Sequence, residues 1–353
     1  MLSLTRWIAV FVSSAALIIR RWIVCITCKS SVKTLLLALP ILLLNAVFAG
    51  AEEYDAIKIT AVNTPCEIPS ADLPVPKRSC TGRDAVFFVH GIYGDKDTFK
   101  NGNFDWPSTL AKALDDEVDV YVIEYHTKLL SWLKRDIASF DDVSDALFAK
   151  LQGKPRPGSG NIRDGLLSFR PYRSVGFIAH SLGGNVTAAY IHTVKSELGH
   201  EERAQNGFLI TLGTPANGAQ IANVAVAIKS MLGIEDPLLK SLERDNTFVR
   251  MLASWRNAED RKATRFYCRP VDLYVGVEGA PMHGMTIVSK ESAEEPYKAL
   301  AREVKFFEGY DHSRIAKPID ANDPVYVWVL DTIKNERKRL DHWDQPKLCR
   351  RSC

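Results

Sequence analysis

The chain has 353 residues, of which 46% are hydrophobic and 25% charged, a balance typical of a folded globular protein and not of a disordered, collagen-like or small disulfide-stabilised chain. The formal net charge of +3 is unevenly distributed: residues 1–33 carry five basic and no acidic side chains, which leaves 40 basic and 42 acidic side chains in the other 320 residues. The main part is therefore nearly neutral and lacks the basic surface that a nucleic-acid partner requires.

Two apolar runs separated by basic residues open the chain. Residues 7–19 are too few to span a bilayer, whereas residues 34–51 form an uncharged run that ends in Ala49-Gly50-Ala51. Small residues at this spacing are typical of a signal-peptidase cleavage site. We therefore expect residues 1–51 to be an export signal, with a retained membrane anchor as the alternative. Either one would place the following chain outside the cytoplasm, in a periplasmic or secreted location.

The cysteines are consistent with an exported protein. Cys66 and Cys80 flank a proline-rich stretch and are placed to close a short loop by a disulfide, with free thiols as the alternative. Cys349 and Cys353 form a second candidate pair. No spacing of Cys and His is typical of a metal site, so no metal is expected.

Strand-like and helix-like segments alternate beyond residue 52. Strands are expected at 57–62, 85–89, 119–125, 175–179, 207–212 and 271–277, and helices at about 106–115, 131–151, 182–198, 217–232, 237–256 and from 324 onward. This alternation predicts an α/β fold with a mostly parallel central sheet and helices on both faces. We expect one large domain at 84–338, preceded by a proline-rich segment at 52–83 and followed by a basic tail at 339–353.

The clearest motif is a buried strand that runs directly into a serine, two glycines and a helix. In Ala179-His-Ser-Leu-Gly-Gly184 this pattern predicts a nucleophile elbow, a tight turn that exposes the Ser181 hydroxyl at the edge of the sheet. An ordinary turn is the alternative. The backbone N–H of Leu182 is then a candidate donor to an oxyanion, and the start of a helix favours developing negative charge there.

A second turn, after the strand at 85–89, supports the prediction of an elbow at Ser181. The apolar strand in Val86-Phe-Phe-Val-His-Gly-Ile-Tyr-Gly94 ends in His-Gly, where a fold with such an elbow places the other oxyanion donor. We expect the backbone N–H of Ile92, with Tyr93 as the alternative, to pair with that of Leu182. His90 precedes the turn and is expected to be structural.

In a catalytic site built on such an elbow, the histidine that acts as the base lies in a loop after the last strand. The three residues then occur in the chain order serine, acid, histidine. His312 meets this order, and His283 is the alternative. His180 adjoins Ser181, but the elbow would turn its ring away from the hydroxyl, so we expect it to pack in the core.

The acid is expected just after the strand at 271–277. Glu278 is the first choice, because a carboxylate there is placed to accept the N–H of the imidazole and fix its tautomer. Glu291 is the alternative. Asp272 lies within the strand, and Asp311 is too close to His312 in the chain to orient it well.

Taken in order, these motifs resemble those of the α/β-hydrolase superfamily, and more narrowly its lipase-like branch with the GPI-inositol deacylases and serine-active-site phospholipid-remodelling proteins. The matching segments are Phe88-Val-His-Gly-Ile-Tyr-Gly-Asp95, Ala179-His-Ser-Leu-Gly-Gly184, Leu212-Gly-Thr-Pro215, Ile287-Val-Ser-Lys-Glu-Ser-Ala293, Asp311-His-Ser-Arg-Ile-Ala-Lys-Pro318 and Asp323-Pro-Val-Tyr326. The resemblance implies an α/β-hydrolase fold with a small helical lid within residues 221–255.

The resemblance also implies a carboxylic-ester hydrolase that acts on lipid or other acyl esters, in association with a membrane surface and without a cofactor. By similarity, Ser181, His312 and Glu278 would be its nucleophile, base and acid. The alternatives are an acyltransferase or thioesterase that uses the same three residues, and a non-catalytic tethering protein on a hydrolase fold, since fold alone does not prove activity.

Overall fold

The computed structural model describes residues 57–67, 79–91, 94–114, 117–125, 140–153, 165–168, 170, 172–197, 206–215, 271–281 and 301–343. The chain divides into two units, residues 1–53 and 54–353, and all described residues belong to the second. The expected leader, the lid segment, and the candidates Ile92, Tyr93, His283, Glu291, Cys349 and Cys353 lie outside the described residues. In the part of the chain that is described, no helix is both long and apolar enough to cross a membrane.

A seven-stranded, mostly parallel sheet forms the centre of the second unit, as the alternating pattern predicts. Its strand order is β1-β5-β2-β6-β7-β8-β9. The bounds are Ile57–Ala61 for β1, Asp84–Val89 for β2, Val118–Tyr125 for β5, Ser174–His180 for β6, Asn206–Leu212 for β7, Asp272–Glu278 for β8 and Ala301–Phe307 for β9. β1 runs antiparallel to β5, and the other neighbours are parallel. The sequence analysis did not predict β9.

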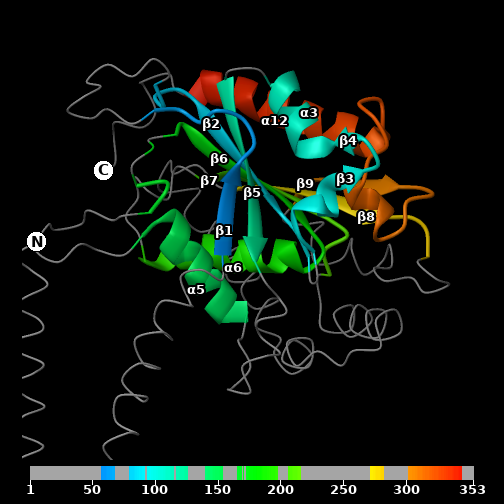
Figure 1. Ribbon diagram of the computed structural model, residues 1–353, viewed down its shortest axis with the longest axis horizontal. Helices are drawn as coiled ribbons and strands as arrows, with labels where there is room; N and C mark the ends of the chain where they lie inside the picture. The colour runs from blue at the N-terminus through cyan, green and yellow to red at the C-terminus, as the bar shows by residue number, and fades with distance from the viewer. Residues whose placement is uncertain are drawn as a thin grey trace, which may run out of the picture. The chain divides into compact units, whose positions relative to one another are not determined.

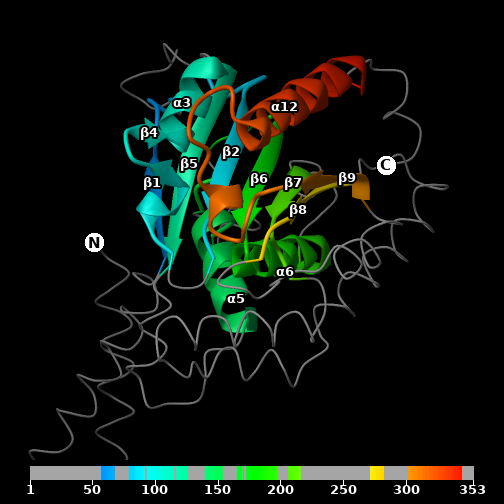
Figure 2. The same cartoon turned by 90° about the vertical axis from the view of Figure 1, so that its right-hand side faces the viewer.

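Helices cover both faces of this sheet (Figures 1 and 2). α3 (Trp106–Ala113) and α12 (Pro324–Trp343) lie on one face, and α5 (Phe140–Leu151) and α6 (Leu182–Glu197) lie on the other. α12 extends past residue 339, where the basic tail was expected to begin. Short elements complete the described part: β3 (Lys100–Asn101), β4 (Phe104–Asp105) and the 3-10 helices Lys96–Phe99 and Arg314–Ala316.

The apolar run of β2 shows why this strand lies in the middle of the sheet. All six of its residues are buried. Successive side chains of a strand point to opposite faces, so Val86 and Phe88 pack with α3 and α12 whereas Phe87 and Val89 pack with α5 and α6. A strand with a helical layer on each face has no polar side, which explains the continuous apolar run.

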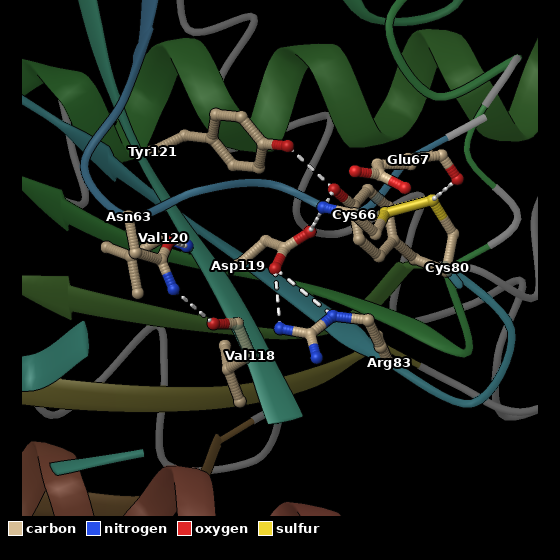
Figure 3. A network of polar contacts seen from close by, with 10 residues as sticks. Asn63, Cys66, Glu67, Cys80, Arg83, Val118, Asp119, Val120 and Tyr121 are labelled. Atoms are coloured by element: carbon tan, nitrogen blue, oxygen red, sulfur yellow. Dashed lines mark hydrogen bonds and ion pairs between the residues drawn. A yellow bond between two sulfur atoms is a disulfide. The ribbon is translucent and has the colours of Figure 1, made fainter. Parts of the chain in front are cut away.

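A polar network fastens the segment between β1 and β2 to the start of β5 (Figure 3). Cys66 and Cys80 form the disulfide that their spacing suggested. The backbone N–H of Cys66 donates to the Asp119 carboxylate over 2.7 Å, and the Arg83 guanidinium pairs with the same carboxylate at 2.7 Å. Tyr172 donates a further hydrogen bond of 2.8 Å. Asp119 is fully buried, and these donors balance the cost of removing its charge from water.

Candidate active site

The elbow is a strained turn between β6 and α6. Ser181 has φ of 51°, and among the described residues it is the one non-glycine with a positive φ. The turn is closely packed, because neither of the glycines that follow Ser181 has room for a Cβ. A Cβ on Gly183 would lie 2.3 Å from the His90 carbonyl oxygen, and one on Gly184 would lie 2.2 Å from Thr214 Oγ1. Strain that the surrounding packing maintains is typical of functional sites.

Ser181, His312 and Glu278 are joined by two hydrogen bonds in series. His312 Nε2 lies 2.9 Å from Ser181 Oγ, and His312 Nδ1 lies 2.8 Å from Glu278 Oε2. A carboxylate accepts hydrogen bonds, so Nδ1 carries the hydrogen and leaves Nε2 to accept from the serine hydroxyl. All three residues are buried, with exposures of 2% for Ser181, 9% for His312 and 2% for Glu278. The sequence analysis selected these three residues, and the structure brings them together.

The sheet order explains how residues so far apart in the chain meet. Ser181 follows β6, Glu278 ends β8, and His312 lies in the loop after β9. β6, β7, β8 and β9 are neighbours, and the carboxyl ends of parallel strands share one edge of the sheet. The three side chains therefore converge at that edge.

The turn after β7 packs against Ser181 and Glu278, a role that the sequence analysis did not assign. Gly213 has φ of +56°, and a Cβ on it would lie 2.6 Å from Glu278 Oε2. The N–H of Ser181 donates to the Leu212 carbonyl over 2.9 Å, and Thr214 Oγ1 donates to the Ser181 carbonyl over 2.9 Å. The signal for this role was the Gly-Thr-Pro segment, which the sequence analysis used only as a mark of resemblance.

The loop that carries His312 is held by the side chain of Asp311, which belongs to the same loop. Asp311 Oδ1 accepts the N–H groups of Ser313, at 2.9 Å, and Arg314, at 2.8 Å. Its carboxylate therefore binds backbone N–H groups at the start of the 3-10 helix Arg314–Ala316, which agrees with the expectation that Asp311 does not orient the imidazole.

His90 is fully buried and structural, as expected from its place before the turn. Its ring stacks on Tyr125 with centroids 4.4 Å apart, its Nδ1 lies 2.7 Å from the Gly91 carbonyl oxygen, and the N–H of Tyr125 donates to its Nε2 over 3.2 Å. A Cβ on Gly91 would lie 2.7 Å from Ser181 Cβ. The chain after β2 thus passes directly beside the serine, and only glycine fits there.

The prediction that His180 merely packs in the core was incomplete. The residue is buried, with 9% exposure, but its Nε2 lies 2.8 Å from the carbonyl oxygen of His312. Burial, with a smaller effect from His312, lowers the pKa of His180 to about 3. His180 and His312 are 132 residues apart in the chain, so no local sequence pattern predicts this contact.

The strand order, the antiparallel first strand and the elbow after β6 are those of an α/β-hydrolase fold, which confirms the predicted fold class. No group of three or more His, Cys, Asp or Glu side chains in the described part of the chain is arranged to hold a metal ion.

No protein-family model matches the sequence, and no curated protein matches it. Solved structures with a related fold include a monoacylglycerol lipase from Paleococcus ferrophilus, 13% identical with a TM-score of 0.43, over 79% of this chain and 99% of that one. Est1E from Butyrivibrio proteoclasticus, solved with ferulic acid, is 11% identical with a TM-score of 0.44, over 82% of this chain and 97% of that one. Carboxyl esterase 2 from Tuber melanosporum is 14% identical with a TM-score of 0.42, over 81% and 86%.

Proposed function

We propose that this protein is an exported serine hydrolase that cleaves carboxylic esters, in particular acyl esters of lipids. In this proposal Ser181 is the nucleophile, His312 the general base and Glu278 the acid that orients His312. The observation that carries the proposal is the series of two hydrogen bonds, 2.8 Å from Glu278 to His312 and 2.9 Å from His312 to Ser181, at a strained elbow. A serine hydroxyl is a weak nucleophile until a neighbouring base takes its proton.

The reaction follows from this arrangement. Ser181 Oγ attacks the ester carbonyl carbon while His312 Nε2 takes the hydroxyl proton. His312 then gives that proton to the leaving alcohol as the C–O bond breaks, which leaves an acyl-enzyme. Water attacks the acyl carbon and loses a proton to His312, and the carboxylic acid leaves as His312 returns the proton to Ser181. Glu278 stabilises the imidazolium in both halves of the reaction.

The negative charge on the carbonyl oxygen requires backbone donors. We assign this role to the N–H groups of Leu182 and Ile92, each worth roughly 3–4 kcal/mol in a preorganised oxyanion hole. The start of α6 at Leu182 supports the first of them. The close approach of Gly91 to Ser181 supports the second, because the segment after β2 then runs beside the reacting atom.

The lipid substrate class rests on the resemblance of the sequence to the lipase-like branch with the GPI-inositol deacylases, and on the apolar segment at 221–255 that is expected to cover the site. Export rests on the apolar leader. A disulfide between Cys66 and Cys80 fits an oxidising compartment.

The test is labelling with a fluorophosphonate probe, which reacts with activated serines. We expect the exported protein to be labelled, Ser181→Ala not to be labelled, and His312→Ala to be labelled at least a hundredfold more slowly. Ser313→Ala, which removes a hydroxyl next to His312, serves as the matched control and should behave as wild type. Labelling of Ser181→Ala, or no labelling of folded wild type, would contradict the proposal.

Separate measurements test the preference for acyl-chain length, hydrolysis against acyl transfer, and export. A panel of p-nitrophenyl esters of increasing chain length should show higher kcat/KM for the longer acyl chains. An added alcohol acceptor should yield less acyl-transfer product than free acid, whereas the reverse would indicate an acyltransferase. Mass spectrometry of the protein recovered outside the cytoplasm should show a new N-terminus close to Glu52.

A further inference from the structure

The reaction described above leaves one buried imidazole at the site without a role. His180 is the last residue of β6 and directly precedes Ser181. Its ring lies beside that of His312, with centroids 4.9 Å apart and planes inclined by 46°. Its Nε2 reaches the main chain of His312 at the carbonyl oxygen, 2.8 Å away. The residue before the proposed nucleophile thus touches the backbone of the proposed base.

The direction of this hydrogen bond determines which ring nitrogen of His180 carries a hydrogen. A carbonyl oxygen only accepts, so His180 Nε2 must carry the hydrogen. His180 Nδ1 is buried and has no hydrogen-bond partner among the described residues, which suits an unprotonated nitrogen. The ring is therefore neutral, and no second positive charge stands beside His312 when that residue takes the proton of Ser181.

The hydrogen bond from His180 restrains the main chain of His312 itself, which the other contacts of the loop do not. The N–H groups of Gly279 and Ala280 donate to the Tyr310 carbonyl, over 2.9 and 3.0 Å, and hold the loop two residues before His312. The ring of His312 is held at both nitrogens, but its hydrogen bond to Ser181 must break and re-form in each turnover. His180 holds the main chain of His312 to the strand end that carries Ser181, and this bond need not change during the reaction.

We propose that His180 is a positioning residue for His312: its Nε2–H donates to the His312 carbonyl and thereby keeps the base in register with Ser181 throughout turnover. This inference rests on the proposed function. A displacement of about 1 Å in a reacting group is sufficient to lower kcat by about a hundredfold, so loss of the donor should affect kcat more than KM.

The test compares replacements that keep or remove the donor. His180→Gln has an amide N–H at about the distance of Nε2 from the backbone, whereas His180→Met has similar length without a donor and His180→Phe keeps a ring without a donor. We expect kcat of the Met and Phe variants to fall ten- to hundredfold with KM within twofold of wild type, and kcat of the Gln variant to stay within threefold. His192→Met, on α6 away from the three residues, is the control and should leave kcat unchanged.

Two results would overturn the positioning role. One is a Met or Phe variant whose kcat lies within twofold of the Gln variant. The other is a Gln variant that folds while both variants without a donor fail to fold, because the hydrogen bond from residue 180 would then serve stability alone.

A measurement independent of catalysis separates this inference from the proposed function. Nitrogen-15 NMR of the histidine side chains should show His180 protonated at Nε2 and unprotonated at Nδ1 at neutral pH, and the opposite tautomer would overturn the inference. Folded wild type that neither hydrolyses esters nor reacts with the probe would overturn the proposed function, and the positioning role would fall with it.

Discussion

Acidification should destabilise the protein through His180. Burial lowers the pKa of His180 to about 3, whereas a histidine in the unfolded chain titrates near 6.5. Between these values the unfolded state binds a proton that the folded state does not, so the free energy of unfolding falls as the pH falls. The contribution is fully present above pH 6.5 and is lost progressively toward pH 3. From pH 7 to pH 5 the loss from this one residue is about 2 kcal/mol, at 1.36 kcal/mol for each pH unit below the unfolded pKa.

Urea unfolding of wild type and His180→Gln at pH 7 and pH 5 measures this contribution. Other titrating groups act on both proteins alike, so the difference between their two pH-dependent losses isolates His180. We expect wild type to lose about 2 kcal/mol more than the variant over this interval. Equal losses in the two proteins would show that His180 takes up a proton in the folded state near its ordinary pKa, and would refute the reasoning from burial.

Three further predictions concern the site and the disulfide. Glu278→Gln should lower kcat by about 10³–10⁴ with little change in melting temperature, because an amide does not hold the required tautomer of His312. Gly213→Ala should lower kcat at least tenfold, because its Cβ would lie 2.6 Å from Glu278 Oε2 at a φ of +56°. Replacing Cys66 and Cys80 together by serine should lower the free energy of unfolding by about 3 kcal/mol, since the bridge closes a loop with a sequence separation of 14.

Each of these predictions has its own control. Gly102→Ala shares the φ of +56° but has no atom within 4 Å of the new Cβ, so it should lower stability by about 1 kcal/mol and leave kcat intact. Equal kcat in the two glycine variants would contradict the proposed contact with Glu278. For the disulfide, wild type treated with reductant should match the double serine variant in urea unfolding. Full activity of Glu278→Gln would show that another carboxylate serves as the acid.

The sequence predicted most of the central sheet and the three residues that meet at its edge. β2, β5, β6, β7 and β8 are apolar runs because helices cover both faces of the sheet, and such runs are visible without a structure. Chain order then selected Glu278 and His312, because they come after Ser181 in the order serine, acid, histidine.

β9 escaped prediction for a physical reason. Ala301–Phe307 carries Arg302, Glu303 and Lys305, and buried and exposed residues do not alternate along it. β9 lies at the end of the sheet, where side chains of an edge strand reach solvent and charged residues are common. An edge strand of this composition cannot be distinguished from a loop by hydrophobic pattern alone.

The roles of Gly213 and His180 were missed for a different reason. Both depend on residues far away in the chain: Glu278 leaves no room for a Cβ at Gly213, and His312 pairs with His180. A motif shows that a small residue or a histidine is present, but not which distant atom it meets. Only the paired strands bring those atoms into range.

The strand order has a consequence for how the molecule acquires its structure. β2 and β6, at the middle of the sheet, pair in parallel although about 90 residues separate them, and the hydrogen bond from Ser181 to His312 closes a span of 131 residues. Contacts of such long range slow folding, because the entropy of closing a large loop is lost before any pairing compensates it. Because the chain is synthesised from its N-terminus, the Cys66–Cys80 bridge can form early. The Ser181–His312 contact can form only after residue 312 has been added. The reactivity of Ser181 would then report the completion of folding, and a chain shortened before β9 would keep the bridge and the elbow sequence but never acquire the base.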